Sequence, residues 1–159
     1  MTQIRVGFGY DAHRFGGPGP VVLCGVPIEH STGLEGTSDA DAAAHAVADA
    51  LLGAAGIGDI GKYFPSDAPQ WLDADSLDMA TQCAVKVNDR GFEIANIDLT
   101  VIAQSVRISP HREQMRERLA AACRVEVGLV SVKATTTDGL GWIGADEGLA
   151  VHAVVALTR

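Results

Sequence analysis

The sequence predicts an α+β fold in which helices back one face of a mixed sheet, giving a two-layer domain. Three segments, near the beginning, the middle and the end of the chain, alternate apolar with polar or small residues, as half-buried strands do. Alanine-rich or well-capped helical segments lie between them. The order of elements, β, α, α, β, α, β, β, favours a core sheet of four strands with an additional N-terminal hairpin.

Composition fits one domain and argues against some classes of function. The 159 residues are 47% hydrophobic, which is enough for one packed core, and we expect a single domain over residues 1–159. The formal charge of −8 argues against a nucleic-acid surface, which needs a basic stripe. Metal ions or backbone dipoles would have to hold an anionic substrate. Three scattered cysteines, no export signal and no long apolar run indicate a reduced, cytoplasmic protein with no membrane span.

In the first half of the chain we expect a strand, a hairpin and a long helix. Ser38 can serve as the N-cap of the helix, because a serine hydroxyl accepts a hydrogen bond from a free N–H group of the first turn. Carboxylates that follow it suit the positive end of the helix dipole, and the helix ends near Gly56. The preceding segments are a strand at 4–10, a glycine- and proline-rich turn at 16–20, a hairpin at 21–29 and a loop at 31–36.

In the second half we expect two helices and three strands. The connector at 57–71 has the length and the Gly/Pro content of a functional loop. A helix begins at Asp75 or Ser76 and stops at Gly91, and the Ser-Pro pair at 109–110 is typical of a helix start. The remaining segments are a strand at 93–104, a helix at 109–124, a strand at 129–137, a loop at 138–148 and a last strand at 149–158.

Three residues form a candidate metal site. Asp11 and His13 follow the first predicted strand and are two residues apart, so in an extended continuation of that strand their side chains point to the same face. The third ligand is His45, which lies among alanines in the predicted helix; Asp41 and Asp49, four residues to either side, could accept a hydrogen bond from its ring. Two histidines and one aspartate leave a tetrahedral zinc ion with an open position, as in catalytic sites. The alternative is a chance Asp-x-His pair and an ordinary hydrogen-bonded helix histidine.

Four segments of the chain resemble those of one enzyme family. They are GYDAHRF at 9–15, TSDADAAAHAVADALLGAAGIGDIGKYFP at 37–65, NIDLTVIAQ at 96–104 and SVKATTTDGLG at 131–141. Together they resemble the 2-C-methyl-D-erythritol 2,4-cyclodiphosphate synthases of non-mevalonate isoprenoid biosynthesis. The likeness runs from about Arg5 to Ala156, and the combination of D-x-H, S-D-x-D-x-x-x-H, D-I-G and A-T-T-T is specific.

The resemblance implies a homotrimer with three active sites at subunit interfaces. The substrate would be 4-diphosphocytidyl-2-C-methyl-D-erythritol 2-phosphate, whose 2-phosphate attacks the β-phosphorus, releases CMP and closes a cyclic diphosphate. Asp11, His13 and His45 stand at the family's zinc-ligand positions, with one zinc ion per subunit. Asp138 matches the residue that helps to hold a second ion, Mg²⁺ or Mn²⁺.

The resemblance also implies a set of substrate contacts. Thr136 matches the residue that holds the reacting phosphate, and Thr37 stands where the family usually has a histidine beside the reacting groups. Ser38 and residues 59–61 would contact the methylerythritol phosphate, whereas residues 103–109 and 134–135 would form the cytidine pocket of a neighbouring subunit. The implied contacts are Asp11, His13, Thr37, Ser38, Asp59, Ile60, Gly61, Phe64, Ala103, Arg107, Ala134, Thr135, Thr136, Asp138 and Trp142.

The chain departs from the family pattern at several places. Besides Thr37, Ser66 falls in a connector that reads FPSDAP instead of FPDTDP or FPPSDP, and Val106-Arg107 replaces Pro-Lys. Ala145 replaces an arginine that lines the central cavity of some relatives. No zinc-ligand position is lost, so we expect the cyclase chemistry to be retained. Two alternatives remain open: a zinc phosphohydrolase that admits water, and a weakly catalytic trimeric relative that binds cytidine phosphates.

Overall fold

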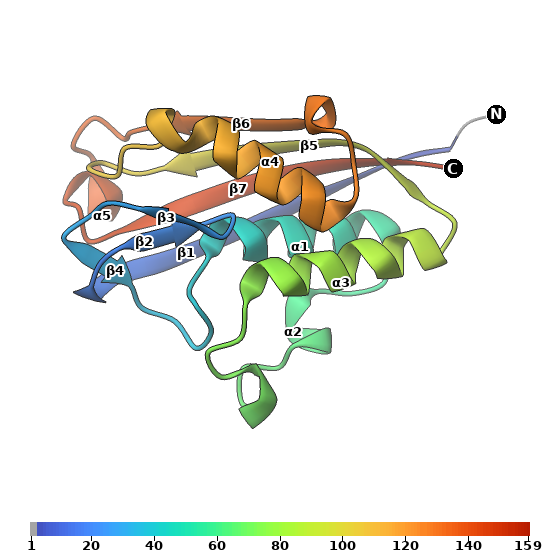
Figure 1. The fold of residues 1–159 in the computed structure, drawn as a ribbon, viewed down its shortest axis with the longest axis horizontal. Coiled ribbons are helices and arrows are strands. Elements are labelled where there is room, and N and C mark those ends of the chain that lie inside the picture. Colours follow the sequence, from blue (N-terminus) through green and yellow to red (C-terminus); the bar gives the residue numbers. More distant parts are fainter. Residues whose placement is uncertain (1–2) are drawn as a thin grey trace.

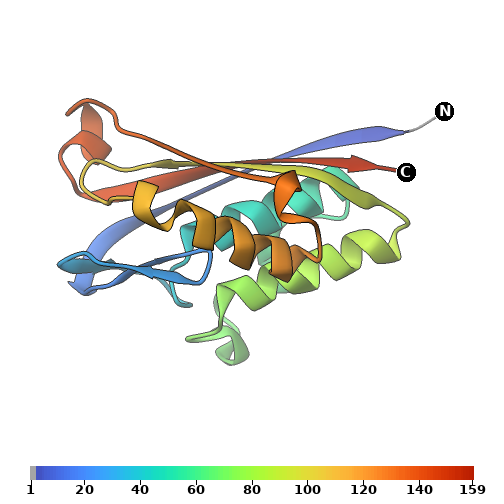
Figure 2. The ribbon, with the colours of Figure 1, turned by 45° about the horizontal axis from the view of Figure 1, so that its top comes forward.

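The computed structural model describes residues 3–159, which form a mixed sheet and three long helices that cover one of its faces (Figure 1). The sheet has the strand order β4-β1-β7-β5-β6. Its strands are β1 (Ile4–Pro18), β4 (Thr32–Leu34), β5 (Glu93–Ile102), β6 (Val130–Thr135) and β7 (Gly148–Thr158). The helices are α1 (Ala42–Ala55), α3 (Ser76–Asp89) and α4 (Arg112–Cys123), and Figure 2 shows them together below the sheet.

The remaining elements are short. A separate two-stranded hairpin consists of β2 (Val21–Leu23) and β3 (Val26–Ile28). The others are α2 (Ile60–Tyr63), α5 (Gly141–Gly144) and the 3-10 turns η1 (Pro69–Trp71), η2 (Ser109–His111) and η3 (Val127–Leu129). The predicted α+β fold is confirmed, with its four core strands and its N-terminal hairpin, and β4 adds a short strand at one edge.

The central strand of the sheet is β7, and the long strand β1 lies along one of its edges. β1 and β7 pair antiparallel from Ile4 opposite Thr158 to Arg14 opposite Gly148, so the first and last strands lie side by side (Figure 1). On its other edge β7 pairs antiparallel with β5, and β5 pairs parallel with β6. A parallel pair requires a crossover connection. Here the crossover contains α4, which follows β5 and precedes β6 in the sequence and packs against β6.

Alternation along β1 gives its two faces different roles. Gly7 and Gly9 face α1, and a Cβ atom on Gly9 would collide with the carbonyl oxygen of Ala46. The absence of a side chain therefore lets α1 approach the strand closely. The opposite face carries exposed apolar side chains on β1 and β7 and is left uncovered by the three helices; these side chains are Ile4, Val6, Phe8, Tyr10 and Val154.

The first strand is longer than predicted. It continues from the predicted end at residue 10 to Pro18, because its last residues pair with β4, Phe15 opposite Leu34 and Pro18 opposite Thr32. The glycine and proline residues that favour a turn at 16–20 thus lie mostly within an edge pairing, where proline is tolerated. The predicted loop at 31–36 contains the partner strand β4.

The N-terminus of α1 also differs from the prediction. Its cap is Asp41 and not Ser38, and the buried carboxylate of Asp41 accepts hydrogen bonds from the backbone N–H groups of Ala44, Cys24 and Gly25. Contacts with the hairpin turn therefore decide between neighbouring residues that are all good caps.

Other local differences are smaller. Ser109 opens the 3-10 turn η2, and α4 begins only at Arg112, so Ser109 does not cap it. The predicted loop at 138–148 contains α5, and the connector at 57–71 contains α2 and η1. Asp75 caps α3, as expected. No helix within residues 3–159 has the length and apolar character needed to cross a bilayer.

Candidate metal centre and active site

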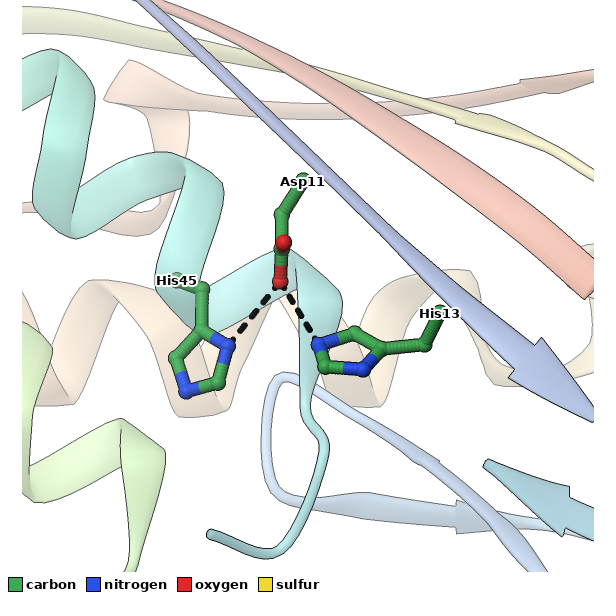
Figure 3. Close-up of side chains that lie close together, drawn as sticks. All are labelled: Asp11, His13 and His45. Atoms are coloured by element: carbon green, nitrogen blue, oxygen red, sulfur yellow. Dashed lines mark hydrogen bonds and ion pairs between the residues drawn. The ribbon is translucent and has the colours of Figure 1, made fainter. Parts of the chain in front are cut away.

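The three predicted ligands converge at one end of the helix layer. Asp11 and His13 come from β1 and His45 comes from α1, and Figure 3 shows both imidazole rings turned towards the carboxylate. The Oδ2 atom of Asp11 lies 2.8 Å from Nε2 of His13 and 2.9 Å from Nδ1 of His45. Within residues 3–159 this is the one group of three or more such side chains close enough to share an ion.

The sequence places these ligands through two simple periodicities. Asp11 and His13 continue the row of Gly7 and Gly9 on the face of β1 that meets α1. His45 precedes Ala46, whose carbonyl oxygen lies against Gly9. The close approach that the glycines allow therefore brings the imidazole of His45 to the carboxylate of Asp11.

Hydrogen bonds behind the ligands orient both imidazole rings. Nδ1 of His13 donates to the backbone carbonyl oxygen of Glu35 at 2.6 Å, so its Nε2 faces Asp11 as an unprotonated nitrogen when the ring is neutral. Nε2 of His45 lies 2.8 Å from the hydroxyl oxygen of Ser76 and 3.1 Å from that of Ser38. No sequence pattern points to Glu35 or Ser76 as partners of the two rings, since neither lies near the ligands in the chain.

The expected role of Asp41 and Asp49 beside His45 is wrong. The carboxylate of Asp41 binds backbone N–H groups of the hairpin turn and of α1, as described above. The carboxylate of Asp49 accepts from the backbone N–H group of Ile60 at 2.9 Å, which fixes the start of α2. Both carboxylates thus stabilise the backbone around the site, and the ring of His45 contacts Ser76 of α3.

Electrostatics at the centre favour a cation between the ligands. Burial alone would raise the pKa of Asp11, but the hydrogen bonds and the charges that His13 and His45 supply when their rings are protonated outweigh it and lower the pKa to about 2. Burial likewise opposes protonation of His13, but the hydrogen bond and charge of Asp11 raise its pKa above the ordinary value. One anionic oxygen and two imidazole nitrogens are donors that fit a divalent transition metal.

A cleft of about 300 Å³ opens beside the metal ligands. Predicted contact residues that line it are Thr37, Ser38, Ile60, Gly61 and Phe64, together with Asp11, His13 and His45. Tyr10, Asp49, Ser66, Trp71 and Met79 complete the lining. Asp59 is not among the lining residues; it is the N-cap of α2, where its carboxylate accepts from the backbone N–H group of Lys62 at 2.9 Å.

Five of the other predicted contacts lie in a second cleft. This cleft, of about 470 Å³, is formed by the segment after β5 and the end of β6. Its lining includes Ala103, Arg107, Ala134, Thr135 and Thr136, as well as Val101, Gln104, Ser105, Val106, Ile108 and Ser109. Within a single chain, most of the predicted contacts are therefore divided between two separate clefts.

Asp138 and Trp142 occupy neither of these two linings. The hydroxyl group of Thr136 donates to the carboxylate of Asp138 at 3.2 Å, so Asp138 lies beside the second cleft. Trp142 borders a depression of about 290 Å³ that it shares with His13, Arg14 and Glu147. The group of side chains that could share an ion within residues 3–159 does not include Asp138.

Fold and site together define an α+β domain whose cleft lies beside three side chains that could hold a metal ion, and comparison with known proteins assigns its family. The model of the YgbB family matches residues 4–158, so the chain belongs to this family. A 2-C-methyl-D-erythritol 2,4-cyclodiphosphate synthase from Shewanella oneidensis is 47% identical over 99% of each chain.

Solved structures agree with this assignment. The bifunctional IspDF from Campylobacter jejuni superposes with a TM-score of 0.96 and 40% identity over 100% of this chain, which spans 43% of that longer protein. A 2C-methyl-D-erythritol-2,4-cyclodiphosphate synthase in a CDP-bound form has a TM-score of 0.87 and 33% identity, covering 96% of this chain and 99% of the other.

Proposed function

We propose that this chain is a 2-C-methyl-D-erythritol 2,4-cyclodiphosphate synthase. An oxygen of the 2-phosphate of the diphosphocytidyl substrate attacks the β-phosphorus. The bond between this phosphorus and the oxygen bridging to the α-phosphate breaks, and CMP leaves with that oxygen. The observation that carries the proposal is the Asp11–His13–His45 group in the cleft of a chain that is 47% identical to a named synthase over nearly its full length.

Asp11, His13 and His45 would hold one zinc ion, in agreement with their donor atoms and their spacing. Bound there, zinc supplies a Lewis acid that stabilises negative charge on a phosphate oxygen. The carboxylate of Asp138 would help to hold a second ion, Mg²⁺ or Mn²⁺, on the substrate diphosphate. The positive charge of these two cations would allow a chain with a formal charge of −8 to bind a polyanionic substrate.

The protein's own task in this reaction is to position the two phosphates. Phosphoryl transfer requires alignment and charge neutralisation more than covalent participation by the protein. Ser38 and the segment 59–61 would hold the methylerythritol phosphate, and Phe64 closes the same cleft with an apolar wall. Thr37, which also lines the cleft, would place its hydroxyl group near the attacking phosphate.

The second cleft would bind the cytidine diphosphate end of the substrate. Ala103 and Ala134 leave room for the base, Arg107 adds a positive charge, and Thr135 and Thr136 add hydroxyl groups at the end of β6. Thr136 would hold the reacting phosphate. The CDP-bound relative supports a cytidine nucleotide as the ligand of this cleft.

Each active site would lie between two subunits of a homotrimer. The separation of the two clefts within one chain supports this assembly, because the substrate needs both sets of contacts. The exposed apolar face of β1 and β7 gives further support, since large exposed apolar patches usually mark an interface. Trp142, beside His13 in a shallow depression, would be covered in the same assembly.

Two further parts of the proposal concern the chain as a whole. Residues 1–159 form one synthase domain, which the family match over 4–158 supports. The protein acts in the cytoplasm, where thiols stay reduced; the three cysteines, all free and buried, support a reducing environment.

Phosphorus NMR of the purified protein with its proposed substrate tests the function. A cyclic diphosphate plus CMP is the expected result. Linear phosphates would show a phosphohydrolase, and retained cytidine binding without turnover would show a binding protein. His45→Ala should remove most of the zinc and the activity while leaving the fold intact, as measured by elemental analysis and circular dichroism. Unchanged zinc content in this variant would contradict the ligand assignment.

A further inference from the structure

The hydroxyl group of Ser76 lies between a candidate metal ligand and a carboxylate. Ser76, the first residue of α3, is fully buried, and its Oγ atom lies 2.8 Å from Nε2 of His45. The same hydroxyl group donates to Oδ1 of Asp39, and the backbone N–H group of Ser76 donates to Oδ2 of Asp39 at 3.1 Å. Figure 3 shows that this nitrogen of His45 is the one turned away from Asp11.

The order of donors along this chain of contacts fixes where the proton of His45 lies. A serine hydroxyl group has one proton, and an ionised carboxylate can only accept. Because the Ser76 proton is used in the bond to Asp39, the oxygen of Ser76 can only accept from Nε2 of His45. Nε2 then carries the proton, and Nδ1 presents its lone pair to the space shared with Asp11.

The neighbouring hydroxyl group of Ser38 does not impose the same order. Its Oγ atom lies 3.1 Å from Nε2 of His45 and 3.1 Å from Oγ of Ser76. Its proton can turn towards Ser76 or into the cleft that Ser38 lines. Ser38 therefore adds a polar contact without determining which nitrogen of His45 is protonated.

We propose that Asp39 and Ser76 are positioning residues that orient His45 and keep its Nδ1 atom available as the metal ligand. This role rests on the proposed function, because it assumes an ion at the Asp11–His13–His45 group. Asp39 precedes α1 and Ser76 begins α3, so the relay joins the N-terminal ends of the two helices beside the cleft. Carboxylate partners of metal-bound histidines commonly act directly; here a buried hydroxyl group is inserted between them.

The test uses zinc itself and the substitution Ser76→Ala, which removes the hydroxyl group and keeps the backbone N–H bond to Asp39. We expect the zinc dissociation constant, measured by competition with a chelator, to rise about 10-fold to 100-fold. In the zinc-loaded wild type, the Nε2 proton of His45 should give a resonance that exchanges slowly with water, and this resonance should be lost in the variant. Asp39→Asn retains an acceptor oxygen for Ser76 but loses the negative charge. Its zinc affinity should therefore lie between that of the wild type and that of Ser76→Ala.

Two controls separate the relay from general effects of removing a hydroxyl group. Ser38→Ala should retain the slowly exchanging Nε2 proton and change zinc affinity by less than about threefold, although Ser38 lies against the same nitrogen. Ser31→Ala removes an exposed hydroxyl group and should match the wild type in both measurements. Neither readout requires turnover of the substrate.

Several results would overturn the proposal. One is a Ser76→Ala protein with wild-type zinc affinity, and another is weaker zinc binding with the Nε2 resonance retained. If Ser76→Ala does not fold, two other results would contradict the proposal. One is an Nε2 proton of His45 that exchanges rapidly in the wild type, and the other is wild-type zinc affinity in Asp39→Asn. If the wild type binds zinc and cyclises its substrate, any of these results overturns the positioning role of Asp39 and Ser76 but leaves the proposed function in place. A wild type that takes up no zinc overturns the proposed function and this role with it.

Discussion

Replacing Gly9 with alanine tests how closely α1 must approach β1 to form the metal centre. The new Cβ atom would collide with the carbonyl oxygen of Ala46, and it would lie 2.9 Å from the backbone nitrogen of Ala50. Because backbone atoms of a packed helix cannot rotate away, α1 would have to retreat from the strand by on the order of 1 Å. The cost should be about 3 kcal/mol, at the upper end of the range for overpacked sites.

The same movement should weaken metal binding. His45 precedes Ala46 on α1, whereas Asp11 follows Gly9 by two residues on β1, so the displacement separates two ligands directly. Functional groups must stay within about 0.5 Å of their productive geometry. We therefore expect Gly9→Ala to bind zinc at least about tenfold more weakly, besides being less stable.

Gly53→Ala is the matched control on the same helix. A Cβ atom there would meet nothing within 4 Å, and alanine favours the helical backbone, so this variant should gain about 0.5–1 kcal/mol. Thermal unfolding at one protein concentration and chelator competition measure both effects. For a chain of this length, 3 kcal/mol corresponds to a fall of about 6–12 °C in Tm. Equal Tm and zinc affinity in Gly9→Ala and the wild type would refute the close-approach argument.

Three further substitutions test other parts of the structure. Phe8→Asp places a charge on the exposed apolar face, so light scattering should report monomers; an unchanged trimer mass would remove this face from the interface. Burial raises the pKa of Asp41 to about 6. This shift contributes about 3 kcal/mol to the free energy of unfolding below about pH 4, and the contribution is lost as the pH rises through 6. Urea unfolding of Asp41→Asn should therefore lack this pH dependence, and parallel curves for the two proteins would contradict it. Thr37→His should raise kcat several-fold with unchanged zinc content, because a protonatable donor stabilises charge better than a hydroxyl group; an equal or lower kcat would show a site already adapted to threonine.

Strand alternation and helix spacing were sufficient to predict the elements that carry the metal ligands. The period of two along β1 placed Asp11 and His13 on one face, and His45 fell within the predicted helix. Their convergence was proposed from the residue types and from the family resemblance, whereas the close approach that Gly7 and Gly9 allow is visible only in the structure. The extent of β1 could not, since pairing with β4 stabilises a backbone that glycine and proline locally disfavour.

The start of α1 shows why cap prediction failed at one residue and succeeded at another. Ser38, Asp39 and Asp41 are all suitable caps, and the sequence offers no local reason to prefer one. Asp41 is selected because the hairpin turn supplies two more N–H donors, from Cys24 and Gly25, to the same carboxylate. At α3 the choice was only between adjacent residues, and Asp75 caps the helix without help from a distant segment.

The partner of His45 illustrates a more general limit on what can be predicted for a site from sequence. A search along the helix finds carboxylates four residues away, but Asp49 is held by the backbone of α2. The ring instead meets Ser76, which lies 31 residues away and looked like an ordinary helix-start serine. A residue that orients a metal ligand needs only one polar atom in the right place. Many residue types meet this requirement, so residue type alone does not identify such a residue in a sequence. Ligands themselves are recognisable because metals restrict their types, whereas their supporting contacts follow from packing of the helix ends.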